Sequence, residues 1–258
     1  EAETTMAKQK LSLCQGPPGC GKTHLLAHIA IREAYANIQR GENKKVLVTA
    51  PSNTVCNDLV AALRSRQLPG GIAPKVIWVI ANNGRGQLTG VVAHHVTPEV
   101  AIHVPPEWNW QPLEANKQMR LRRLFEDRKK QALPQEQERA FESWYKKAVR
   151  ATVAAADIIV ATTIQGGLKI IEDVEFSLTI VDEAGLIPEE QAQIFLAKGA
   201  DQYILIGDQN QLKARQIVPE AERMGLQSLF VRLLQKTQIC MLKEYRRSAN
   251  QALIRVIS

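Results

Sequence analysis

The sequence has no long hydrophobic run. No apolar stretch approaches the roughly 18 residues that a helix needs to cross a bilayer, so we expect no membrane partner. The first ten residues, EAETTMAKQK, are polar and resemble neither a secretion signal nor an organellar transit peptide. The chain does not begin with methionine, and we therefore expect it to be a piece of a longer protein.

Cysteine is also scarce and unpaired. The four cysteines, Cys14, Cys20, Cys56 and Cys240, form no CxxC pair and no Cys/His cluster with the spacing of a zinc site. This pattern excludes a disulfide-stapled scaffold and a zinc module. It is typical of a protein kept in a reducing compartment, and we expect the cytoplasm or the nucleus.

The charge that is present has an uneven distribution. The 258 residues carry a net charge of +7, and the segment 117–150 alone holds eleven Lys and Arg against five Asp and Glu. Such a basic segment is either a solvated helical face or a surface that contacts a phosphate backbone. A hydrophobic content of 45% is enough to build a substantial core around which this segment is placed.

Short apolar runs alternate with helical patterns along most of the chain. We expect strands at residues 11–14, 45–50, 75–80, 157–162, 177–182, 203–208 and 238–242. Strands that alternate with helices predict a parallel sheet covered on both faces. The fold class is therefore α/β with three layers, and we interpret residues 1–258 as one lobe.

The alternation breaks at residues 82–86, Asn-Asn-Gly-Arg-Gly. From there to about Arg150 no apolar strand pattern occurs, and two helical stretches are separated by Leu133 and Pro134. These stretches predict an antiparallel helical pair. We interpret residues 84–150 as an insertion that stands off the sheet.

The stretch GPPGCGKT, residues 16–23, carries the strongest chemical signal. It fits the GxxxxGK[ST] pattern, with a strand before it and a helix after it. Glycines let backbone N–H groups wrap a phosphate, and the helix N-terminus adds positive potential. We expect Lys22 to reach the β- and γ-phosphates of a nucleotide and Thr23 to hold Mg²⁺. The expected nucleotide contacts are Gly16, Pro17, Pro18, Gly19, Cys20, Gly21, Lys22, Thr23 and His24.

Two adjacent carboxylates end the strand predicted at 177–182. Ligands of open α/β sheets lie at the carboxyl ends of the strands. We expect Asp182 to hold Mg²⁺ through water and Glu183 to act as the base that activates the attacking water. The alternative is the surface start of a helix, but a phosphate-binding loop elsewhere in the chain favours the catalytic interpretation.

Two further segments are weaker candidates. Gln211, in GDQNQL, follows a strand and is expected to sense the γ-phosphate, although an ordinary polar turn is the alternative. In EYRR, Arg246 is a candidate to neutralise charge on the γ-phosphate. Tyr245 offers a ring for the base, and an unremarkable basic strand end is the alternative for both.

These segments, in this order, resemble superfamily 1 helicases, in the branch that includes the nonsense-mediated-decay RNA helicase and senataxin. SLFVRL at 228–233 resembles a further family segment. The resemblance implies a RecA-like motor lobe that uses ATP and Mg²⁺, translocates 5′ to 3′ on single-stranded RNA or DNA, and contacts the strand through a helical insertion. It also implies nucleic-acid contacts at Pro51, Ser52, Asn53, Thr54, Thr162 and Thr163.

Members of this family have a second RecA-like lobe, and the resemblance implies that a longer chain supplies it. We therefore expect weak ATP hydrolysis by this lobe alone. Two other functions stay open: a nucleotide-gated module that binds nucleic acid with little hydrolysis, and a P-loop switch that regulates a protein partner. The choice between RNA and DNA also stays open.

Overall fold

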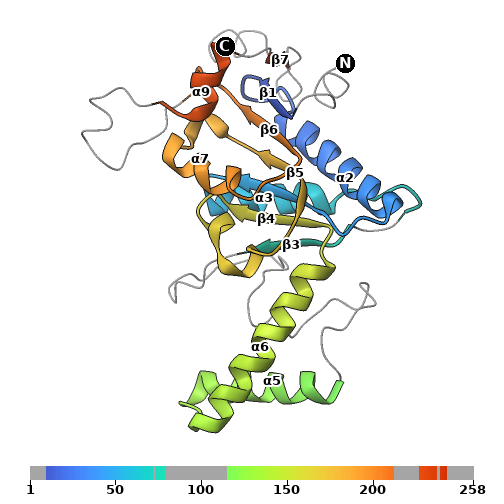
Figure 1. Cartoon of the computed structure of the whole chain (residues 1–258), viewed down its shortest axis with the longest axis vertical. Helices are drawn as coiled ribbons and strands as arrows, with labels where there is room; N and C mark the ends of the chain where they lie inside the picture. Colours follow the sequence, from blue (N-terminus) through green and yellow to red (C-terminus); the bar gives the residue numbers. More distant parts are fainter. Residues whose placement is uncertain (1–9, 72–73, 80–114, 212–226, 237–238, 243–258) are drawn as a thin grey trace.

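The protein contains a seven-stranded sheet in which every strand pair is parallel (Figure 1). The computed structural model describes residues 10–71, 74–79, 115–211, 227–236 and 239–242. Within them the strand order is β3-β4-β2-β5-β6-β1-β7. The strands are β1 (Leu11–Gln15), β2 (Lys45–Ala50), β3 (Val76–Val79), β4 (Ile158–Thr162), β5 (Phe176–Val181), β6 (Gln202–Gly207) and β7 (Ile239–Met241).

The predicted α/β class and all seven predicted strands are confirmed. These strands could be recognised as apolar runs because strands of a covered parallel sheet are buried on both faces. Strands β2 to β5 are buried at every position. Strands β5 and β6 each begin and end one residue earlier than predicted. Asp182 and Asp208 therefore lie just past the ends of their strands, in the loops.

Two of the helix ends lie at residues that capping chemistry favours. Helix α2 ends at Gly41, which has a φ of 67° in the left-handed region that glycine accepts. The side chain of Ser52 accepts a hydrogen bond from the Val55 N–H and caps α3. The α-helices are α2 (Lys22–Arg40), α3 (Asn53–Arg64), α5 (Ala115–Lys130), α6 (Gln135–Ala155), α7 (Glu189–Leu196) and α9 (Leu229–Leu234).

Three short 3₁₀ turns complete the described elements: η2 (Gln165–Gly167), η3 (Lys169–Ile171) and η4 (Ala184–Leu186). No helix in the described ranges has the length and apolar character needed to span a bilayer.

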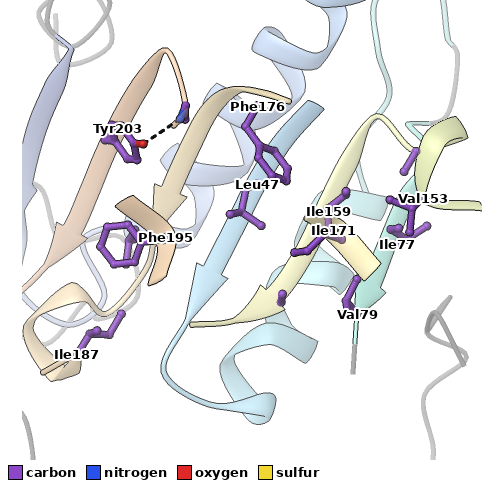
Figure 2. Close-up of a cluster of buried hydrophobic side chains, with 14 of the residues drawn as sticks. Leu47, Ile77, Val79, Val153, Ile159, Ile171, Phe176, Ile187, Phe195 and Tyr203 are labelled. Atoms are coloured by element: carbon purple, nitrogen blue, oxygen red, sulfur yellow. Dashed lines mark hydrogen bonds between the residues drawn. The ribbon is translucent and has the colours of Figure 1, made fainter. Parts of the chain in front are cut away.

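Each face of the sheet has its own hydrophobic core. Helices α2 and α3 cover one face and pack on strand residues such as Val48 and Val160. On the other face, Ile77 lies beside Val153 of α6, and Leu47 and Ile159 belong to the same core as Phe195 of α7 (Figure 2). Two cores on opposite faces give the three-layer arrangement, and they leave the strand ends free to carry the loops of a site.

Helices α5 and α6 form the predicted antiparallel pair. The N-terminal end of α6 stands away from the sheet (Figure 1). Arg128 forms an ion pair of 2.8 Å with Glu138, and the guanidinium of Arg120 lies 5.4 Å from the ring centroid of Trp144. These contacts join the end of α5 to the start of α6 and the start of α5 to the middle of α6. Helix α6 runs to Ala155, beyond the predicted boundary near residue 150.

One buried hydroxyl in the sheet has no hydrogen-bond partner among the described residues. It belongs to Thr179 of β5, which is fully buried. An unpaired buried hydroxyl costs about 1–3 kcal/mol. We therefore expect Thr179→Val, which has nearly the same shape, to raise the free energy of unfolding by about 1 kcal/mol in urea denaturation.

Thr49→Val is the matched control. Thr49 is equally buried in the neighbouring strand, but its hydroxyl forms a hydrogen bond of 3.4 Å with the Thr163 hydroxyl. The same substitution there should lower the free energy of unfolding by about 1 kcal/mol. Equal destabilisation by both substitutions would contradict this account of Thr179.

Candidate nucleotide and nucleic-acid site

The predicted site segments converge at one edge of the sheet. All strands are parallel, so the loops that follow β4, β2, β5, β6 and β1 leave the same edge, in that spatial order. The phosphate-binding loop follows β1. The loop with Asp182 follows β5, and the loop with Gln211 follows β6, which lies between β5 and β1. The segments predicted to contact nucleic acid follow β2 and β4. The sheet therefore separates the two kinds of predicted contact into neighbouring halves of one edge.

The phosphate-binding loop is held at both ends. The Gly16 N–H donates to the Gly207 carbonyl of β6 at 3.1 Å, and Gly19 and Gly21 have φ values of 79° and 91°, which side chains rarely allow. Lys22 begins α2 and is 7% exposed. Its Nζ donates to the carbonyls of Gly16 (2.9 Å) and Pro17 (3.3 Å). The loop thus places a buried ammonium beside the helix N-terminus, a combination that favours an anion.

The residues after Lys22 are more open. Thr23 is half-buried, and His24 is exposed in the first turn of α2. The Arg66 side chain donates to the His24 carbonyl at 3.4 Å, which connects the end of α3 to the start of α2. That first turn contains no acidic residue to compete with a bound phosphate.

Asp182 lies buried at the end of β5, with 3% of its surface exposed. Its N–H donates to the Thr49 carbonyl at 2.8 Å, and its Oδ1 accepts from the Glu183 N–H at 3.0 Å. Burial, reinforced by the nearby Glu183 charge, raises the pKa of the Asp182 carboxyl from 3.8 to about 6. The Glu183 N–H and Lys22 oppose this shift, so the charge of the phosphate-loop lysine acts on Asp182.

Glu183 has an unusual backbone conformation. Its φ of 49° is the only positive value at a non-glycine residue in the described part of the chain. A residue in this region is strained, and such strain persists only where the surroundings fix it. Here the next turn, η4, packs against β6: a Cβ added at Gly207 would lie 3.0 Å from the Gly185 nitrogen. The sequence offered no signal for this close approach, because it depends on which strands are neighbours.

The loop after β6 is organised by Asp208. This buried carboxylate accepts from the Asn210 N–H at 3.0 Å and from the Gln211 side-chain amide at 3.3 Å. Gln211, the predicted phosphate sensor, is half-buried. Its partner Asp208 follows Gly207, whose carbonyl accepts the hydrogen bond from the phosphate-binding loop.

The segments predicted to contact nucleic acid differ in exposure. Ser52, Asn53 and Thr54 are exposed and Pro51 is half-buried. The side chains of Thr162 and Thr163 are buried.

Each of these buried threonines braces its loop. The Thr163 hydroxyl donates to the Ala50 carbonyl at 3.3 Å, and the Thr162 hydroxyl accepts from the Gln165 N–H at 3.3 Å. Ile164, which the sequence did not single out, is 62% exposed beside them. Tyr245 and Arg246 lie outside the described residues.

Lys22 is a buried lysine at the end of a glycine-rich loop, and Asp182 is a buried carboxylate after β5, two strands from β1 in the sheet. This arrangement is typical of the nucleotide-binding edge of a P-loop NTPase lobe. Comparison with known proteins agrees. The chain matches the family described as an AAA domain over residues 1–97 and 107–217. It belongs to this family, and its relatives support the predicted likeness to superfamily 1 helicases of the nonsense-mediated-decay branch.

Three relatives illustrate the likeness. The chain is 30% identical over 238 residues to the ATP-dependent helicase NAM7 of Saccharomyces cerevisiae and 29% identical over 239 residues to a regulator of nonsense transcripts 1 homolog of Neurospora crassa. It is 27% identical over 249 residues to the DNA-binding protein SMUBP-2 of Mesocricetus auratus. These matches cover 90%, 92% and 90% of this chain but only 22%, 20% and 23% of the relatives.

Solved structures of helicases show a looser likeness. The PRRSV helicase aligns with 94% of this chain and 32% of its own, at 12% identity and a TM-score of 0.43. Bacteroides Pif1 bound to single-stranded DNA aligns with 99% of this chain and 44% of its own, at 14% identity and a TM-score of 0.40.

The raised pKa of Asp182 predicts a pH-dependent cost of its charge. The folded lobe holds the Asp182 proton up to about pH 6, whereas the unfolded chain releases it near pH 3.8. The contribution of this group to the free energy of unfolding is therefore full below pH 4, and roughly 2–3 kcal/mol is lost as the pH rises through 6. Asp182→Asn carries no charge at either pH and removes this loss.

Urea denaturation of the nucleotide-free protein at pH 4.5 and 7.5 checks this prediction. The gain in stability of Asp182→Asn over the wild type should be larger at pH 7.5. The same difference between the two proteins at both pH values would show that the Asp182 charge costs the fold nothing.

Proposed function

We propose that this chain is the ATP-hydrolysing lobe of a helicase that moves along single-stranded nucleic acid. One observation carries the proposal: Lys22 and Asp182, 160 positions apart in the sequence, are both buried at the same sheet edge and close enough for the lysine charge to act on the carboxylate. A phosphate chain with a divalent cation supplies the negative and positive charges that such a lysine and carboxylate complement.

In this proposal Lys22 binds the β- and γ-phosphates, and the N–H groups of the loop and of the first turn of α2 surround them. The Gly16 and Pro17 carbonyls that accept from Lys22 hold its ammonium at the loop. Within the loop Cys20 is buried, whereas Pro17, Pro18 and Gly19 remain partly exposed and are proposed to face the nucleotide. His24 is exposed at the next position and is proposed to contact the nucleoside.

The residues present fit a nucleotide-bound Mg²⁺. Asp182 is a hard oxygen ligand, and Thr23 adds a hydroxyl at the start of α2. The described residues include no group of three or more acidic, His or Cys side chains that would hold a metal without the nucleotide. Mg²⁺ bound there would neutralise charge on the transferred phosphoryl group.

Glu183 is proposed as the base that takes the proton of the attacking water, because it is the carboxylate adjacent to Asp182 and is only partly buried. Gln211 is proposed to hydrogen-bond the γ-phosphate and to lose that bond after hydrolysis. Because its amide donates to Asp208, this loss would change the conformation of the loop after β6. Arg246 and Tyr245 keep their predicted roles toward phosphate and base as part of the proposal.

Nucleic acid is proposed to lie along the half of the edge formed by β2 and β4. Ser52, Asn53 and Thr54 are exposed there, and Thr162 and Thr163 hold the loop that presents Ile164. The α5–α6 hairpin adds a row of exposed basic side chains that a phosphate backbone would neutralise: Arg139, Lys146, Lys147 and Arg150. Movement along RNA or DNA with 5′-to-3′ polarity would need a second RecA-like lobe from a longer chain, in the cytoplasm or nucleus.

The nucleotide site is tested by Lys22→Ala. Losing an ammonium that hydrogen-bonds charged phosphates should weaken Mg-ATP binding roughly ten- to a hundredfold in isothermal titration calorimetry. Lys44→Ala is the matched control, because Lys44 pairs with Asp201 at the opposite edge of the sheet. Unchanged affinity in Lys22→Ala, with the fold intact, would refute the site.

The nucleic-acid surface is tested by replacing Lys146, Lys147 and Arg150 together with alanine. Each phosphate contact on a single strand contributes about 0.7 to the slope of log affinity against log salt concentration. The triple variant should bind single-stranded RNA more weakly, with a slope reduced by about 2. Fluorescence anisotropy at several salt concentrations measures it. A slope equal to that of the wild type and of Lys44→Ala would remove the hairpin from the proposed surface.

A further inference from the structure

Two cysteines face each other beneath the phosphate-binding loop. Cys14 of β1 and Cys240 of β7 are direct partners in the register of these parallel strands, and their side chains are hydrogen-bonded to each other. Cys14 is fully buried, whereas Cys240 is half-buried on the strand next to β1. The pair therefore combines a partly exposed cysteine with a fully buried one, and Cys20 of the phosphate-binding loop also lies near enough for its charge to act on Cys14.

The spacing of this pair suits a covalent bond. Neighbouring strands lie about 4.8 Å apart, and disulfides join Cα atoms that are about 4.4–6.8 Å apart. Cys56 of α3 is also buried, but no cysteine is among the groups that influence it. It serves as an internal reference for a buried thiol that no other described cysteine influences.

The end of β7 is in direct contact with the phosphate-binding loop. The Leu242 N–H donates to the Gln15 carbonyl at 2.8 Å. A Cβ added at Gly16 would lie 3.0 Å from the Leu242 Cβ and even closer to the Cys20 sulfur. Gly16 in turn accepts the hydrogen bond of Lys22. Gly16 has no free space around its Cα, so a change in the spacing of β1 and β7 at Cys14 would shift Gly16. A shift of Gly16 would move the carbonyl that accepts from the Lys22 ammonium.

We propose that Cys14 and Cys240 are an oxidation site, where peroxide produces a reversible disulfide that weakens nucleotide binding. The sulfur of Cys240 attacks a peroxide oxygen, the O–O bond breaks, and Cys240 becomes a sulfenic acid as one water leaves. The sulfur of Cys14 then attacks the Cys240 sulfur, the S–O bond breaks, and the hydroxide leaves as water with the Cys14 proton. The two thiols lose two electrons to the peroxide.

The reaction should be slow. Burial raises the pKa of both thiols, which keeps the reactive thiolate scarce at neutral pH. The hydrogen bond and the charge of Cys240 raise the pKa of Cys14 further, whereas the hydrogen bond with Cys14 lowers the pKa of Cys240 and partly offsets its burial. The oxidation is therefore followed over hours rather than seconds.

The test treats the 258-residue chain with hydrogen peroxide and maps the peptides without reducing agent. We expect a cross-linked pair of peptides containing Cys14 and Cys240, in the wild type and in Cys56→Ala. Cys240→Ala should give no such pair. The absence of the cross-linked peptides in folded wild-type protein after prolonged oxidation would overturn the proposal.

Nucleotide affinity provides the second readout, and this part rests on the proposed nucleotide site. Oxidised wild type and oxidised Cys56→Ala should bind Mg-ATP at least several-fold more weakly than the reduced proteins, and dithiothreitol should restore affinity. Oxidised Cys240→Ala should keep its affinity. An equal loss in Cys240→Ala, or a disulfide without any loss, would overturn the regulatory role. Failure of reduced protein to bind Mg-ATP would count against the proposed function, and the peptide map would still decide the oxidation site.

Discussion

The pairing of β1 between β6 and β7 is the constraint on which the site depends. It ties the phosphate-binding loop to β6 through the hydrogen bond between Gly16 and Gly207 and to β7 through the one between Leu242 and Gln15. Strand β5 is the next strand beyond β6, so the same pairing sets Asp182 near Lys22. A parallel sheet is stable only when covered on both faces, and the two helical layers meet this need while leaving the strand ends open.

The charges at this edge are held at a cost to the fold. Asp182 is buried, and the pKa of its carboxyl is raised, while Glu183 takes a left-handed backbone conformation beside it. A site that binds a divalent cation and phosphates must hold charged side chains in place before binding. These charges are desolvated, and they destabilise the empty site. The close approach of Gly185 and Gly207 shows how the fold fixes this turn: two chain segments meet without side chains between them.

Much of the fold was predictable because local patterns determine it. Strands buried on both faces gave apolar runs, Gly41 and Ser52 marked helix ends, and Pro134 separated the hairpin helices. The P-loop and Asp182 were predictable from residue type and spacing. The strand order was not, and the features that depend on it were missed. They include the Thr49 carbonyl that holds Asp182, the exposure of Ile164 beside two buried threonines, and the facing of Cys14 and Cys240.

The central claim is that this edge hydrolyses ATP in response to a nucleic-acid strand. Phosphate release from Mg-ATP, with and without single-stranded RNA, tests it most directly when the wild type is compared with Glu183→Gln. The account predicts release that RNA stimulates and that Glu183→Gln reduces by roughly 10²–10⁴, with nucleotide binding kept. Equal release from both proteins would contradict it, because Glu183 would then take no part. Tight binding of nucleotide and RNA with no release from the wild type would make the lobe a nucleotide-gated binding module instead.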